Sequence, residues 1–121
     1  MFGFFGKSSN LPETWKTIES LQELQEAEKA SFEKPVVLFK HSTSCSISSM
    51  AKSRLEGASD GSSPTIYYLD LLSHRDISNE IASRFKVRHE SPQVVVLDNG
   101  KVQYHASHGA INMNDLVKNT Q

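Results

Sequence analysis

Apolar positions along the chain alternate between helical spacing and short continuous runs. Helical spacing recurs over residues 20–30, after Cys45 and over residues 77–85, which predicts three helices. Continuous or β-rich runs predict strands at residues 36–39, 65–70 and 94–97, with a short extended piece at 15–18 and a return strand at 102–106. A final amphipathic segment follows Gly109.

The polar residues between these runs are typical of helix starts and turns. Ser20 and Glu23 have the spacing of a capping box, which places a helix start at residue 20. Gly57 supplies a helix stop, and residues 60–64 and 98–100 have turn composition. The Glu/Lys-rich stretch 19–34 is interpreted as a solvated helix face.

Alternating strands and helices predict the fold class α/β, with a central mixed sheet flanked by helices. Parallel β-α-β units are expected along most of the chain, and the late hairpin at residues 98–100 adds an antiparallel edge. We expect one domain over residues 11–121 and a tail over residues 1–10, which contain three phenylalanines.

Composition narrows the function classes. The 121 residues are 37% hydrophobic and 22% charged, with a formal net charge of −1 and no basic run, so nucleic acid is not expected as a partner. The single cysteine excludes a disulfide framework, a CxxC redox pair and a cysteine-rich zinc site. No signal peptide or membrane span is recognised, so a cytoplasmic protein without membrane contact is expected.

Cys45 carries the strongest chemical signal. It lies where a buried strand is followed by a helix, and the helix N-terminus favours a thiolate, the form that attacks disulfides. Lys40 and His41 could add positive potential, and Ser48, one turn later, could direct its hydroxyl at the sulfur. A lone cysteine is more often a small buried hydrophobe, but the surrounding serines and the helix start favour a reactive one.

A second signal is Pro92, directly before the strand at residues 94–97. Its simpler interpretation is a residue that opens a strand. The sharper one is a cis peptide bond after Ser91, which would turn the Ser91 backbone outward to pair with an extended substrate segment. In combination with the predicted topology, we favour the second interpretation.

Residues 39–48, 91–93 and 107–109 together resemble the monothiol bacilliredoxin family over about residues 15–118. These are thioredoxin-fold proteins of the bacillithiol redox system. The resemblance implies a thioredoxin-like fold, with Cys45 as the nucleophile and Pro92 as a cis-proline. The chain departs from related active-site loops at Ser46, where proline is frequent.

The resemblance also implies a mechanism, in which Cys45 removes bacillithiol from protein mixed disulfides and a second thiol molecule clears the adduct. Bacillithiol is then a cosubstrate, no cofactor is tightly bound, and the partners are a low-molecular-weight thiol and S-thiolated client proteins. Expected catalytic residues are Cys45, Ser48 and His41. Expected substrate-binding residues are Lys40, Thr43, Ser44, Ser91, Pro92, Ser107, His108 and Gly109.

Two other functions fit the same residues. Cys45 and Ser48 have the Cys-x-x-Ser spacing of monothiol glutaredoxins that share an iron–sulfur cluster across a dimer, although the loop lacks their Gly-Phe interior; visible colour would reveal such a cluster. A redox-inactive interaction protein is the other alternative, and an unreactive thiol would favour it. A dedicated metal site among the five histidines is not expected, because no carboxylate is clearly grouped with them.

Overall fold

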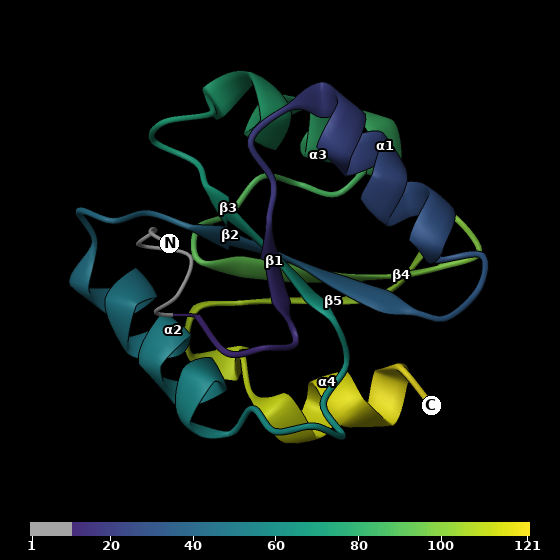
Figure 1. Cartoon of the computed structure of the whole chain (residues 1–121). Coiled ribbons are helices and arrows are strands. Elements are labelled where there is room, and N and C mark those ends of the chain that lie inside the picture. Colours follow the sequence, from purple (N-terminus) through teal and green to yellow (C-terminus); the bar gives the residue numbers. More distant parts are fainter. Residues whose placement is uncertain (1–10) are drawn as a thin grey trace, which may run out of the picture.

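A computed structural model of the chain describes residues 11–121 (Figure 1). The tail expected over residues 1–10 lies outside the described residues. The elements, in chain order, are β1 (Trp15–Thr17), α1 (Leu21–Ala30), β2 (Val36–His41), α2 (Ser46–Gly57), β3 (Ile66–Asp70), α3 (Arg75–Phe85), β4 (Gln93–Asp98), β5 (Lys101–Ser107), η2 (His108–Ala110) and α4 (Met113–Asn119).

The strands form one mixed sheet in the order β1-β3-β2-β4-β5. β1 and β2 run parallel to β3, whereas β4 runs antiparallel to β2 and β5 antiparallel to β4. The mixed α/β sheet expected from the sequence is therefore confirmed.

The expected parallel direction of β4 is wrong. After α3, residues 86–92 run back along the helix: His89 lies near Ser78, in the first turn of α3, and near Lys40, at the end of β2. Seven extended residues can span roughly 23 Å, more than the roughly 16 Å of an eleven-residue helix. β4 consequently starts at the edge where β2 ends and runs in the opposite direction.

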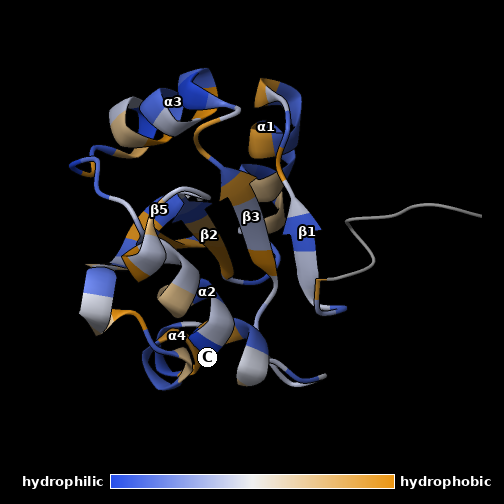
Figure 2. Ribbon diagram, turned by 90° about the vertical axis from the view of Figure 1, so that its left-hand side faces the viewer, coloured by the Kyte–Doolittle hydropathy of each residue, from blue (hydrophilic) through white to orange (hydrophobic). Residues whose placement is uncertain are grey.

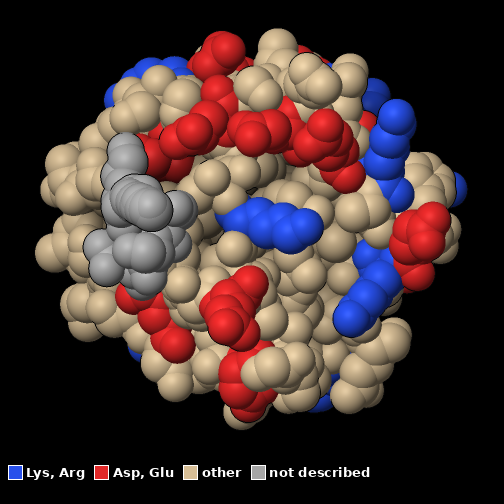
Figure 3. Space-filling view, viewed as in Figure 1, with Lys and Arg blue, Asp and Glu red and all other residues tan. Residues whose placement is uncertain are grey.

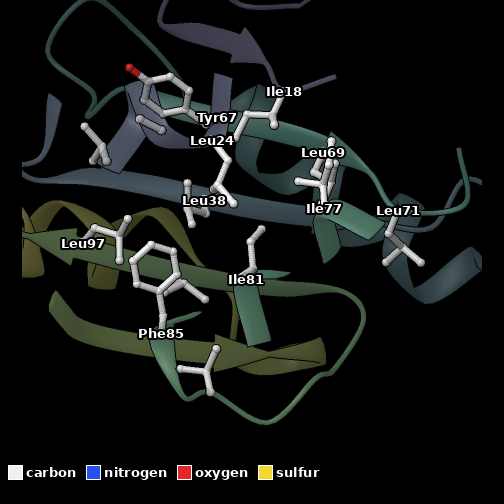
Figure 4. Packing of buried hydrophobic residues seen from close by; sticks show 14 residues of the cluster. Ile18, Leu24, Leu38, Tyr67, Leu69, Leu71, Ile77, Ile81, Phe85 and Leu97 are labelled. Carbon is white, nitrogen blue, oxygen red and sulfur yellow. The ribbon is translucent and has the colours of Figure 1, made fainter. Parts of the chain in front are cut away.

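Helices cover both faces of the sheet, α1 and α3 on one side and α2 and α4 on the other (Figure 1). Two buried clusters match these layers, because successive residues of a strand point to opposite faces. Leu38 packs with Leu24, Ile77 and Ile81 of α1 and α3 (Figure 4), while Phe39 belongs to the cluster of α2 and α4. Burying each such side chain stabilises the fold by about 1.5–3 kcal/mol.

Polar residues cover the outer sides of these layers. Figure 2 shows hydrophobic colour concentrated on the sheet and hydrophilic colour on the outer turns of α1 and α3. In Figure 3, acidic side chains gather over α1, the helix interpreted from the sequence as a solvated face. Within residues 11–121, no helix combines the length and apolar character that crossing a bilayer requires.

The predicted N-cap Ser20 at the start of α1 is confirmed, whereas the reciprocal bond of the capping box goes to the Glu19 N–H instead of the Ser20 N–H. Ser20 has extended backbone angles, and its hydroxyl accepts a hydrogen bond of 3.1 Å from the Glu23 N–H. The Glu23 carboxylate in turn accepts one of 2.7 Å from the Glu19 N–H. The first bond satisfies an amide of the first helical turn that has no partner within the helix, and the second ties the residue before the cap to the helix.

We expect Ser20→Ala to lower the free energy of unfolding by about 1 kcal/mol, because the Glu23 amide loses its cap. Urea denaturation measures the change. Ser53→Ala, an exposed substitution inside α2, is the matched control and should leave the free energy of unfolding nearly unchanged. Equal stability of both variants would contradict a stabilising cap at Ser20.

Candidate active site

Cys45 lies at the N-cap position of α2, in a tight turn after β2. Its N–H donates a hydrogen bond of 3.2 Å to the Ser42 carbonyl, which closes the turn, and its own carbonyl accepts the bond of 3.0 Å from the Ser49 N–H. The N–H groups of the intervening residues 46–48 therefore have no acceptor within the helix. The partly exposed thiol stands at the positive end of the helix dipole.

Ser48 braces this turn from inside the protein. Its fully buried hydroxyl accepts a hydrogen bond of 3.0 Å from the Ser42 N–H and lies 2.7 Å from Nδ1 of His41. One hydroxyl thus joins the end of β2 to the first turn of α2. The Ser48 hydroxyl, predicted from its spacing to point at the sulfur, is bound to His41 and the Ser42 amide instead.

His41 is nearly buried at the end of β2, on the face covered by α2. Its ring lies near the rings of Phe39 and Tyr68, with centroid distances of 6.0 Å and 5.7 Å. Burial lowers the pKa of His41, and the charge of Lys52 lowers it further, against the opposing effects of Asp70 and Glu56. A neutral imidazole at pH 7 follows, so the positive potential expected from His41 is not supplied there.

Lys40 points to the opposite face of the sheet. Its side chain is fully buried, and Nζ lies 2.9 Å from Nδ1 of His89, in the connection that precedes β4. Burial lowers the Lys40 pKa to about 8. Contact with a substrate was expected of Lys40, whereas the structure encloses it beneath the site.

Pro92 and the turn after β5 form the other side of the site. The peptide bond between Ser91 and Pro92 is cis, in agreement with the interpretation of the sequence. The Pro92 carbonyl accepts a hydrogen bond of 3.1 Å from the His108 N–H, and Ser107 pairs with Gln93 in the sheet. Within the described part of the chain, neither the N–H nor the carbonyl of Ser91 makes a hydrogen bond.

Arg54 links that turn to the helix of Cys45. Its Nη2 donates hydrogen bonds of 3.3 Å and 3.1 Å to the carbonyls of His108 and Ile111. A weaker contact of 3.6 Å joins His108 Nδ1 to the Glu90 carboxylate. No sequence pattern pointed to Arg54, His89 or Glu90, because each acts through a contact between segments distant along the chain.

The remaining predicted residues lie around this edge of the sheet. Thr43 and Ser44 are exposed in the Cys45 turn, and His108 and Gly109 are exposed in the turn after β5. Within residues 11–121, no three or more His, Cys, Asp or Glu side chains are grouped so that they could hold a metal ion.

Comparison with known protein families matches residues 16–116 to the monothiol bacilliredoxin BrxC family. The chain belongs to this family. The match covers most of the chain, including the Cys45 turn, Pro92 and the turn after β5.

Solved structures agree with this membership. A structure described as having a thioredoxin fold matches with a TM-score of 0.78 and 29% sequence identity, covering 88% of this chain and 93% of that chain. Thioredoxin NaTrxh from Nicotiana alata matches with a TM-score of 0.71, 16% identity and coverages of 91% and 96%. Mitochondrial thioredoxin 3 from Saccharomyces cerevisiae matches with a TM-score of 0.66 and 17% identity, covering 88% of this chain and 93% of that chain. The fold is thioredoxin-like, and the bacilliredoxin family assigns the chain to thiol oxidoreductase-like proteins.

We expect Ser48→Ala to lower the free energy of unfolding by about 2 kcal/mol, because it leaves the Ser42 amide and the His41 ring nitrogen without their partner. Chemical denaturation measures the loss. Ser49→Ala changes the next, exposed serine of the same helix turn and should cost far less. A loss no larger than that of Ser49→Ala would show that the brace contributes little.

The lowered pKa of Lys40 predicts that the free energy of unfolding rises with pH above about pH 8. Its pKa is about 8 in the folded chain, below the ordinary 10.5, so the unfolded state binds more protons between these values and stability increases with pH. The expected gain between pH 8 and 10 is about 2 kcal/mol. The measurement stops at pH 10, because Tyr68, whose pKa is raised to about 12, acts in the opposite direction above that pH.

Lys40→Met should remove this rise, whereas Lys16→Met, at an exposed position of β1, should retain it. Urea denaturation at a series of pH values measures both variants. The same pH dependence in Lys40→Met and the wild type would disprove the assignment to Lys40.

Proposed function

We propose that the chain is a monothiol thiol–disulfide oxidoreductase that removes bacillithiol from protein mixed disulfides. The observations that support this most directly are the position of Cys45, a partly exposed thiol at the start of α2, and the Ser91 backbone, which makes no hydrogen bond among residues 11–121. The helix start stabilises a thiolate, and a free extended backbone can pair with a client segment.

The proposed reaction proceeds by two exchanges. The Cys45 thiolate attacks the bacillithiol sulfur of the mixed disulfide; a new disulfide forms between Cys45 and bacillithiol, and the client cysteine leaves as a thiolate that takes up a proton. A second bacillithiol thiolate then attacks the bacillithiol sulfur attached to Cys45. Cys45 is reduced again, and the two bacillithiol molecules leave as their disulfide.

A second small-molecule thiol is required because the chain has no other cysteine. Ser48 occupies the place one helical turn after Cys45, and its hydroxyl is bound to His41 and the Ser42 amide. It cannot form a disulfide, and its role in the proposal is to hold the turn that carries the nucleophile.

Stabilisation of the thiolate comes from the backbone in this proposal. Lys40 lies on the opposite face of the sheet, and the lowered pKa of His41 keeps its ring neutral at pH 7. The N–H groups of residues 46–48 remain as the nearest positive ends of dipoles.

The exposed and partly exposed polar groups around Cys45 would hold the small thiol. Thr43 and Ser44 belong to the Cys45 turn, while Ser107, His108 and Gly109 lie across the site on the turn that Arg54 fixes. Client proteins carrying the mixed disulfide would be the macromolecular partners. A reducing compartment such as the cytoplasm suits this chemistry, because the lone thiol stays reduced there.

We expect the reduced protein to form a single adduct with oxidised bacillithiol, recorded by intact mass, and Cys45→Ala to form none. Oxidised glutathione is tested in parallel, and a faster reaction with bacillithiol would support the proposed cosubstrate. Equal or faster reaction with glutathione would move the proposal to a glutaredoxin-like protein. Absence of both adducts on folded protein would overturn the enzymatic function and favour an interaction protein.

A further inference from the structure

Lys40 makes an unusual contact for a lysine. It lies within the central strand β2 with 0% of its surface exposed, and Nζ meets the Nδ1 atom of His89 at 2.9 Å. An ammonium group can only donate hydrogen bonds, so His89 accepts at Nδ1 and carries its own proton at Nε2. A buried charge requires such a partner, because burial without one is costly.

His89 belongs to the connection 86–92, which brings Ser91 to the edge of the sheet. Side chains from the surrounding elements hold this connection: Lys40 of β2 and, at 3.5 Å, Ser78 of α3 contact the His89 ring, and Gln93 Nε2 donates a bond of 2.9 Å to the Arg88 carbonyl. Lys40 and Gln93 are paired across β2 and β4, so both anchors start from the same place in the sheet.

The same register brings the residues before Gln93 to the edge of the sheet where β2 ends and the chain enters the turn of Cys45. The Ser91 backbone makes no hydrogen bond among the described residues. Among the described residues, Ser91 is therefore held through its chain neighbours, by the anchored connection on one side and by Pro92, whose carbonyl is bonded to the His108 N–H, on the other.

We propose that Lys40 and His89 are positioning residues, which hold the Ser91 backbone where a disulfide substrate of Cys45 binds. This inference rests on the proposed function for its substrate. Neither residue touches the substrate; Lys40 acts through His89, and His89 through the connection that carries Ser91.

The anchor is sensitive to protonation of His89. Burial lowers the His89 pKa, and the charges of Lys40 and Arg75 lower it further, against an opposing effect of Glu90. A protonated ring would lose its acceptor and place a second cation 2.9 Å from the Lys40 ammonium. The contact therefore holds at neutral pH and is lost on acidification.

Three variants separate the parts of this anchor. His89→Asn keeps an acceptor near the Nδ1 position but cannot titrate, His89→Ala removes the acceptor, and Lys40→Met removes the donor. His105→Asn, at an exposed position of β5, is the matched control.

NMR pH titration of the His89 ring and the Ser91 amide tests the anchor without any substrate. We expect the Ser91 amide signal to follow the His89 titration in wild type and His105→Asn, and to lose that step in His89→Asn. Lys40→Met should raise the His89 midpoint, because a neighbouring cation is removed. A Ser91 signal that ignores the His89 titration would overturn the proposal.

Kinetics with a bacillithiol mixed disulfide of a model peptide test the consequence. At pH 7, His89→Ala should raise KM roughly tenfold, the effect of losing one charge-assisted hydrogen bond, with kcat little changed. His89→Asn should restore KM and remove its increase at acid pH. A wild-type KM in His89→Ala would contradict a positioning role. So would a tenfold slower alkylation of Cys45 by iodoacetamide in this variant, because the loss would then lie in the thiol itself and not in substrate binding.

Failure of the two proposals can be distinguished. A wild-type protein inactive on every mixed disulfide would refute the proposed function, while the NMR titration would still decide whether Lys40 and His89 control Ser91.

Discussion

The buried hydroxyl of Ser48 connects the two elements on which the site depends. It binds the Ser42 amide and the ring of His41, and so fixes the end of β2 against the first turn of α2. The Cys45 turn lies between these two points, and its backbone is closed by the bond from the Cys45 N–H to the Ser42 carbonyl. A small change in this brace would alter the direction of the thiol and its relation to the helix N-terminus.

Strand β2 carries two polar side chains into opposite layers of the protein. His41 enters the layer of α2, where it meets Ser48, and Lys40 enters the layer of α3, where it meets His89. The alternation of a strand requires that neighbouring residues point to opposite faces. The end of β2 thus contacts both segments that border the site, the turn of Cys45 and the connection 86–92 that carries Ser91.

Burial determines how these groups can act. Desolvation disfavours the charged forms, which lowers the pKa of His41 and brings that of Lys40 to about 8. Neither group presents a free positive charge to the thiol at pH 7: His41 is neutral, and the Lys40 ammonium is enclosed with His89. Both side chains instead hold backbone segments in place, and the helix start supplies the electrostatic contribution.

The local features of the fold followed from the sequence. The capping spacing of Ser20 and Glu23, the apolar run of β2 and the serine-rich turn before a helix at Cys45 are encoded by neighbouring residues, because helix and strand periods and caps act over a few positions. The mixed sheet and the family resemblance were predicted on the same basis.

The direction of β4 was not predicted from the sequence, because the path of residues 86–92 back along α3 depends on contacts with Lys40 and Ser78. Tertiary structure alone also decided that Lys40 is buried beneath the site, that Ser48 faces His41 rather than the sulfur, and that Arg54 holds the turn at His108. In each case the local sequence allows a long side chain or a buried hydroxyl several hydrogen-bond partners, and only the packing of distant segments determines which partner lies within reach.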